Sequence, residues 1–112
     1  MSPDDVIRLR HMAEAAEAAL RFCRGRVRAD LDTDDMLRFA LTRAVEIIGE
    51  AATKVSIDTR TQLSSIAWPA IVGMRNRLVH AYFDVDSDIL WTTVSERLPL
   101  LLRELNLTLS RG

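Results

Sequence analysis

The sequence is poor in the residue types that hold metals and form disulfides: among 112 residues there are two histidines and one cysteine. A lone cysteine, Cys23, cannot form an internal disulfide, and two distant histidines with one cysteine do not supply a set of metal ligands. No apolar run approaches the roughly 18–20 residues that span a bilayer, and the N-terminus lacks the apolar segment of a signal peptide. We expect a cytoplasmic protein with no bound metal or cofactor.

The chain also lacks an excess of positive charge and a glycine-rich phosphate loop. Its net charge is −1, so any contact with nucleic acid would have to come from a local patch of basic side chains. Hydrophobic residues make up 48% of the chain and charged residues 28%, which is typical of a folded globular protein and excludes a disordered one. The length predicts a single domain over residues 1–112.

The first segment has the features of an amphipathic helix. Ser2 is a candidate N-cap, Pro3 occupies the first helical position, and Asp5 completes a capping-box pattern. Apolar residues then recur at spacings of three and four. Cys23 falls on this apolar stripe, which favours a buried small side chain over a reactive thiol. His11 lies on the opposite side and is expected to be solvated.

A second helix is predicted from about residue 34 to residue 55, with Asp32 or Thr33 as its N-cap. Apolar residues again recur at helical spacing, and charged residues occupy the opposite side. Gly49 lies inside this helix, where glycine costs about 1 kcal/mol relative to alanine. Its presence indicates close packing against a neighbouring helix.

The remaining half predicts two further long helices and no strand. Trp68-Pro69 marks the start of the third, because proline is tolerated in the first turn, and a short helix or turn precedes it. The last helix is expected at about 87–109, with a kink at Pro99, which lacks a backbone N–H and crowds the preceding turn. Four main helices with short connections predict an all-α, antiparallel four-helix bundle.

The stretch RNRLVHAY, from Arg75 to Tyr82, contains a histidine and the chain's one tyrosine. On a regular helix Arg75 lies at the edge of the core-facing ridge, while Asn76 and His80 lie four residues apart on the other side. A site that uses both Arg75 and His80 would therefore lie in a groove closed by another element, such as a second copy of the chain. A structural role is the alternative: Arg75 covering the bundle edge, His80 capping the helix and Tyr82 packing its ring.

Three segments together resemble the HepT-like toxins of the HEPN superfamily: MRNRLVHAYFDVD, the preceding IAWPAIVG, and VEIIGEAATKVS in the second helix. The resemblance runs along nearly the whole chain. The signature of this branch is R-x4-H-x-Y with a polar residue after the arginine, and here it is formed by Arg75, Asn76, His80 and Tyr82. One departure is Ala81, where glycine is more usual, and it removes no functional group.

The resemblance implies a HEPN-like bundle that forms a homodimer, with two signature motifs meeting in one cleft. It further implies a metal-independent endoribonuclease, the toxin of a type VII-like toxin–antitoxin system whose cognate antitoxin is an MntA-like nucleotidyltransferase. In this reading His80 performs acid–base chemistry on RNA, Arg75 stabilises negative charge, and Asn76 orients the phosphate or the histidine. Arg77 would contact the RNA backbone or serve the fold, and Tyr82 would accept AMP from the antitoxin.

A second hypothesis retains the HEPN-like fold but assigns the chain no catalytic activity. The chain would then be a non-catalytic HEPN interaction module that binds a nucleotidyltransferase partner. The intact pair of Arg75 and His80 favours the enzyme, although such residues can also be kept for binding alone. A neighbouring gene for a short nucleotidyltransferase would identify the toxin–antitoxin system.

Overall fold

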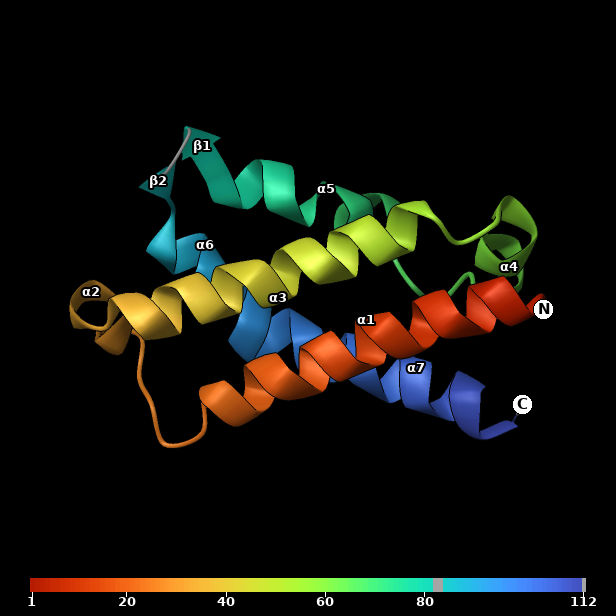
Figure 1. Cartoon of the computed structure of the whole chain (residues 1–112), viewed down its shortest axis with the longest axis horizontal. Coiled ribbons are helices and arrows are strands. Elements are labelled where there is room, and N and C mark those ends of the chain that lie inside the picture. Colours follow the sequence, from red (N-terminus) through yellow and green to blue (C-terminus); the bar gives the residue numbers. More distant parts are fainter. Residues whose placement is uncertain (82–83, 112) are drawn as a thin grey trace.

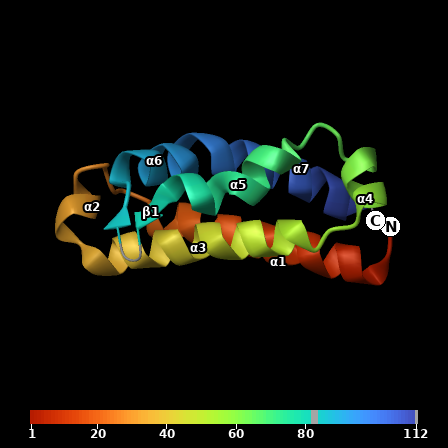
Figure 2. The ribbon, with the colours of Figure 1, turned by 90° about the horizontal axis from the view of Figure 1, so that it is seen from above.

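Long helical segments lying side by side in alternating directions form the body of the protein (Figures 1 and 2). The structure is a computed structural model that describes residues 1–81 and 84–111, with the backbone alone at positions 75, 79–81 and 84. The long segments of this described part are α1 (Pro3–Phe22), α3 (Asp35–Thr53), α5 (Trp68–Leu78), and a last segment made of α6 (Ser87–Thr92), the π-helical turn η1 (Thr93–Arg97) and α7 (Leu98–Arg111). The short helices are α2 (Asp30–Thr33) and α4 (Ile57–Gln62).

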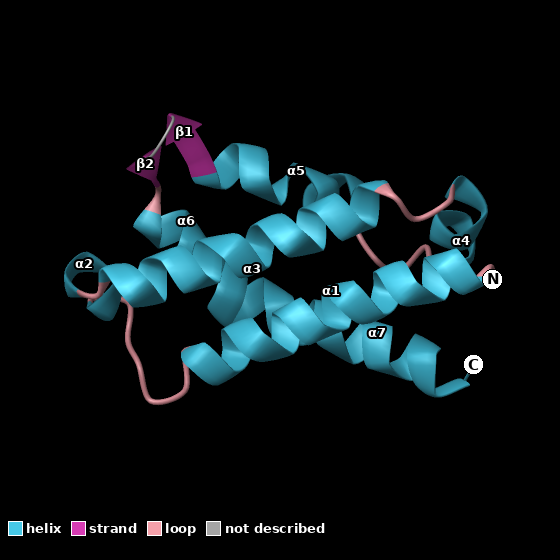
Figure 3. Cartoon of the chain, viewed as in Figure 1, coloured by secondary structure: helices cyan, strands magenta, loops and turns pink. Residues whose placement is uncertain are grey.

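The predicted all-α, four-helix architecture is confirmed, including the short helix before the third long one. Helix α1 packs most extensively on α3 and α7, and α3 packs on α5. Helices account for most of the ribbon (Figure 3). A two-stranded hairpin, β1 (Val79–Ala81) and β2 (Asp84–Val85), follows α5 and was not predicted.

The core is one cluster of apolar side chains to which every long segment contributes. Burying a leucine, isoleucine or methionine side chain contributes about 1.5–3 kcal/mol, so this cluster is the main stabilising term. The largest completely or almost completely buried apolar side chains are Leu9, Met12, Leu31, Leu41, Val45, Ile48, Leu78, Leu90, Val94, Leu98 and Leu105. Within the described residues, no helix is both long enough and apolar enough to cross a membrane.

The start of α1 is tied to the start of α4 through Asp5. The predicted N-cap is confirmed, because the Ser2 hydroxyl accepts the N–H of Asp5 at 3.1 Å. The buried Asp5 carboxylate makes contacts that the capping-box pattern did not predict. It accepts the backbone N–H of Ser56 at 3.0 Å and the hydroxyl groups of Ser56 and Thr59, each at 2.6 Å. These bonds join segments more than fifty residues apart.

The predicted N-cap of the second long helix is wrong. Asp34, rather than Asp32 or Thr33, caps α3 by accepting a backbone N–H of its first turn at 3.0 Å. The two predicted residues belong instead to α2, which buries Leu31. Arg26 fixes this arrangement, because its guanidinium group donates to the Asp34 carboxylate at 2.7 Å. The first-turn N–H and this guanidinium both hold the pKa of Asp34 below its ordinary value.

Gly49 marks a close approach between α3 and α5, as the sequence indicated. The residue is buried. A Cβ atom at this position would lie 3.7 Å from the backbone carbonyl oxygens of both Ile71 and Val72. These are ordinary van der Waals distances, so α3 lies in close contact with the backbone of the helix that carries the Arg75 motif.

Pro99 disturbs the last helical segment, as predicted. The segment changes from α-helix to the π-helical turn η1 just before Pro99 and resumes as α7. Proline lacks a backbone N–H and its ring crowds the carbonyl group four residues earlier, so a local widening relieves the conflict. His11 is exposed, as predicted. Cys23, the residue after α1, is half-buried where a buried side chain was predicted, and this burial raises the pKa of its thiol.

Asp5 should make the fold sensitive to strong acid. The hydroxyl groups of Ser56 and Thr59 and the Ser56 N–H lower the pKa of Asp5 to about 2, against about 3.9 in an unfolded chain. Because the pKa of Asp5 is lower in the folded state than in the unfolded state, its ionised carboxylate stabilises the fold at pH values above the unfolded-state pKa. This stabilisation is lost as the pH falls from about 4 to about 2. Asp5→Asn should therefore lower the melting temperature at pH 7 by about 5 °C or more.

The difference between Asp5→Asn and the parent should shrink as the pH falls through that window. Thermal unfolding followed by circular dichroism at several pH values measures both effects. Asp4→Asn is the matched control, because Asp4 is an exposed residue of the same helical turn. Equal melting temperatures for the parent and Asp5→Asn at pH 7 would contradict the stabilising role of this carboxylate.

Candidate functional site

Helix α5 ends at Leu78, two residues before the histidine of the motif. The chain then enters the hairpin, and His80 lies in β1. The backbone N–H of Asp86 donates to the Leu78 carbonyl oxygen at 2.9 Å and closes the hairpin at its base. The prediction that Asn76 and His80 are helical neighbours is therefore wrong. The alternative that His80 caps the end of that helix depends on its side chain, which lies outside the described part of the structure.

His80 lies at an irregular position of the hairpin. Val79 is paired with Val85, and Ala81 with Asp84, so two steps along β1 correspond to one step along β2. Such a bulge changes the direction of neighbouring side chains and is common beside active sites. Val79 and Val85 are β-branched and favour extended backbone, which helps explain why the helix does not continue.

Two polar side chains of the motif are described, and both belong to the last turns of α5. Asn76 is exposed to solvent. Arg77 is also exposed, and its guanidinium group folds back along the helix to donate to the backbone carbonyl of Ala70 at 3.1 Å. Arg77 therefore has a contact within the fold, and a contact with RNA stays a prediction.

The predictions for the other motif residues concern side chains outside the described part of the structure. Tyr82 lies outside the described residues, as do the side chains of Arg75 and His80. The backbone places Arg75 in α5 and His80 in β1, on two consecutive elements. A single site formed by Arg75, Asn76 and His80, and the modification of Tyr82, therefore stay predictions.

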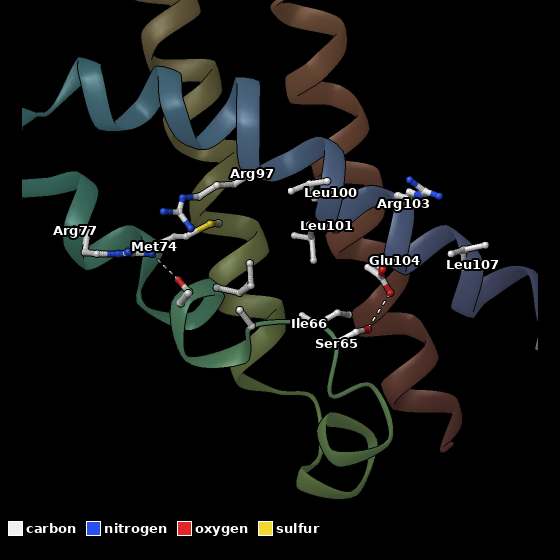
Figure 4. A pocket seen from close by; sticks show the side chains of 13 residues that line it. Ser65, Ile66, Met74, Arg77, Arg97, Leu100, Leu101, Arg103, Glu104 and Leu107 are labelled. Atoms are coloured by element: carbon white, nitrogen blue, oxygen red, sulfur yellow. Dashed lines mark hydrogen bonds between the residues drawn. The ribbon is translucent and has the colours of Figure 1, made fainter.

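A groove separates α5 from η1 and α7 along the side of the bundle (Figure 4). Its volume is about 460 Å³, and an adjoining cavity of about 280 Å³ continues toward α6. Met74, Arg77 and Arg97 line both cavities. Arg77 is the neighbour of Asn76 in the sequence, so the groove begins beside the motif.

The groove brings two further arginines, Arg97 and Arg103, close to Arg77. Arg97 of η1 and Arg103 of α7 line it together with Arg77. In the described part of the chain, no carboxylate forms an ion pair with any of these three. The one acidic side chain in the lining, Glu104, accepts a hydrogen bond from the Ser65 hydroxyl at 2.9 Å. The groove therefore carries excess positive charge in a chain of net charge −1.

No sequence signal could have connected these arginines. Arg77 and Arg97 are far apart along the chain, and the groove is created by the way α5 and the last segment are placed. Fourteen of the fifteen basic residues are arginine, so one more arginine on a helix does not stand out.

Among the described residues, there is no group of three or more histidine, cysteine or acidic side chains placed to hold a metal ion.

Comparison with known proteins gives the family. The model of the family described as "Ribonuclease HepT-like" matches residues 12–107, which include the complete motif. A protein of Thermococcus cleftensis named "Probable ribonuclease HepT" is 41% identical over 93 residues, covering 83% of this chain and 84% of the relative. No match was found among solved structures.

Two further relatives are similar over the same length. A protein of Methanocaldococcus jannaschii named "Putative RNase MJ1380" is 34% identical over 94 residues, covering 84% of this chain and 86% of the relative. A protein of Caldanaerobacter subterraneus subsp. tengcongensis named "Putative RNase TTE0752" is 33% identical over 96 residues, covering 86% of each chain. These matches and the helical bundle agree with the resemblance seen in the sequence, and the chain belongs to the Ribonuclease HepT-like family.

Proposed function

We propose that this chain is a metal-independent endoribonuclease and the toxin of a type VII-like toxin–antitoxin system. The observation that carries this proposal is the family match over residues 12–107, which spans the complete R-x4-H-x-Y motif. Relatives that align over more than four fifths of the chain are named as ribonucleases. The fold adds a cationic groove that begins beside the motif.

The proposed chemistry needs no metal because RNA carries its own nucleophile. A histidine removes the proton of the 2′-OH, and the resulting oxyanion attacks the adjacent phosphorus. The bond to the 5′-oxygen breaks, a second histidine protonates that oxygen, and a 2′,3′-cyclic phosphate remains. His80 acts as the acid–base group, Arg75 stabilises the charge of the phosphorane-like transition state, and Asn76 orients the phosphate or His80.

A homodimer would supply the second histidine, because each chain carries one histidine in its motif. Two exposed apolar side chains at the start of α3 support such an assembly: Met36 is 83% exposed and Phe39 is 60% exposed. The start of α3 and the hairpin that contains His80 lie at the same end of the bundle in both views (Figures 1 and 2). A partner protomer covering this end would bury apolar surface close to the two motifs.

The protein should therefore be a dimer at micromolar concentration in light scattering. Phe39→Glu should weaken the dimer, because it places a charge in the proposed contact. Ile57→Glu is the matched control, since Ile57 is 78% exposed and belongs to α4 at the opposite end of the bundle (Figure 1). A monomeric parent protein would contradict the composite site.

Purified protein should cleave single-stranded RNA in the presence of EDTA. His80→Ala and Arg75→Ala should each reduce the rate by roughly 10²-fold or more, the usual cost of losing an acid–base or charge-stabilising group. His11→Ala and Arg10→Ala are matched controls on α1, because both residues are exposed. Gel analysis of a labelled oligoribonucleotide measures the rates.

Two results would reject this mechanism. Cleavage that requires a divalent metal would exclude the metal-independent route. If the parent does not cleave RNA but still binds its partner, or if both motif variants cleave like the parent, the chain is instead better explained as a non-catalytic HEPN interaction module.

We further propose that a cognate MntA-like nucleotidyltransferase antitoxin silences the enzyme by adding AMP to Tyr82. The phenolic oxygen, after losing its proton to a base, would attack the α-phosphorus of ATP and release pyrophosphate. Tyr82 follows His80 by two residues in the sequence. The attached group adds a phosphodiester negative charge and considerable bulk close to the motif, and both effects oppose the binding of RNA.

Incubation of the protein with the antitoxin and ATP should raise its mass in steps of one AMP group and abolish RNA cleavage. Peptide mass spectrometry should locate every step on the peptide that contains Tyr82. Tyr82→Phe keeps the aromatic ring and should resist both changes while retaining the parent's melting temperature. A Tyr82→Phe protein that is still modified and silenced would place the switch elsewhere.

A further inference from the structure

The groove between α5 and the last helical segment has the charge and shape of a site for a nucleic-acid strand. Arg77 lines one wall, and Arg97 and Arg103 line the other. Figure 4 shows Arg97 reaching from η1 toward Met74 and Arg77 on α5. A guanidinium group is planar and can donate two parallel hydrogen bonds to a phosphate. An anionic ligand with repeated phosphates fits this lining.

We propose that the groove binds the RNA strand on one side of the scissile linkage, with Arg97 and Arg103 contacting two separate phosphates. This inference rests on the proposed ribonuclease function and adds to it a substrate-binding surface outside the R-x4-H-x-Y motif. Arg97 and Arg103 are six residues apart, which corresponds to about 9 Å along a helix. That separation allows each arginine to engage a different phosphate of one strand.

The groove also offers apolar surface for the other parts of a nucleotide. Leu100 is 66% exposed and Leu107 is 46% exposed, and both line the groove between and beyond the two arginines. Met74 and Ile71 contribute further apolar surface from α5. Ribose and base faces can lie against such side chains while the phosphates face the guanidinium groups, and this kind of contact does not depend on base sequence.

Arg77 connects the groove to the catalytic motif. It directly follows Asn76 on α5, and it lines both the main groove and the adjoining cavity. Its hydrogen bond to the Ala70 carbonyl holds the guanidinium group along the helix, at the edge of the groove. A strand that passes Arg77 would therefore run from the motif toward Arg97 and then along α7 to Arg103.

The positive charge favours RNA over a second copy of this chain as the occupant. A second copy of the chain has a net charge of only −1, whereas an RNA strand carries one negative charge per phosphate, so the cationic groove attracts RNA more strongly. The exposed apolar pair Met36 and Phe39 lies on α3, and neither residue lines the groove. The proposed dimer contact and the proposed RNA groove are therefore different surfaces.

Binding should be measured with a short fluorescent oligoribonucleotide that is 2′-O-methylated throughout, so that it lacks the nucleophile for cleavage. The double variant Arg97→Gln and Arg103→Gln should raise Kd by at least about tenfold. It should also reduce the dependence of log Kd on log salt concentration by about 0.7 for each lost phosphate contact. The matched control is Arg10→Gln with Arg24→Gln, which removes the same charge from exposed positions outside the groove.

A second variant tests the groove without removing an arginine. Leu100→Glu places a negative charge in the lining at a solvent-exposed position, so the cost to folding is small. It should weaken binding of the same oligonucleotide by about tenfold or more through repulsion of the phosphates. Ile57→Glu, which adds the same charge on α4, should bind as the parent does. Circular dichroism establishes that each variant is folded.

The outcomes separate this inference from the proposed catalysis. If the parent cleaves RNA while the groove variants bind like their controls, the groove assignment is wrong and the ribonuclease proposal stands. If the groove variants lose affinity but the parent does not cleave unmodified RNA, the groove assignment stands and the catalytic proposal fails. If the groove variants change the mass in light scattering and leave RNA affinity unchanged, the groove is a protein interface and the inference is overturned.

Discussion

The hydrogen bond between the Asp86 N–H and the Leu78 carbonyl oxygen, 2.9 Å long, determines how the motif is presented. The Leu78 side chain is 1% exposed and fixes the end of α5 in the core. Asp86 also caps α6, because its carboxylate accepts the N–H of Ile89 at 3.0 Å. Asp86 therefore closes the hairpin that contains His80 through its backbone N–H and starts the last helical segment through its carboxylate. The groove lies between the two helical segments that Asp86 connects.

Local signals predicted the fold well wherever they acted within one helix. Apolar spacing, the Ser2 cap and the effect of Pro99 depend on residues a few positions apart, and all three are confirmed. Gly49 was correctly interpreted as a close approach, although the sequence did not say to which helix. The prediction of the N-cap of α3 was wrong because several neighbouring aspartates can cap a helix equally well. In the structure the capping residue Asp34 is also paired with Arg26, eight residues earlier.

The candidate site was harder to predict because it depends on contacts between elements. The strands of the hairpin are only three and two residues long, too short for an alternating pattern to be recognised. The end of α5 was therefore missed, and with it the position of His80 on a bulge instead of a helix. Arg97 and Arg103 line the groove because α5 lies on one side of it and η1 with α7 on the other. The local sequence pattern around each arginine does not predict this arrangement. The motif itself was found because its spacing resembles that of a known family.

The central claim is that the 2′-OH of RNA is the nucleophile and that the motif moves its proton without a metal. The most direct test uses an oligoribonucleotide with one cleavage site, in the presence of EDTA, beside an identical strand carrying a single 2′-deoxy nucleotide immediately 5′ to the scissile phosphate. The account predicts that the all-ribose strand yields a 2′,3′-cyclic phosphate, identified by mass spectrometry, and that the substituted linkage stays intact. Cleavage at the 2′-deoxy position, or a product ending in a free 3′-hydroxyl group, would contradict it.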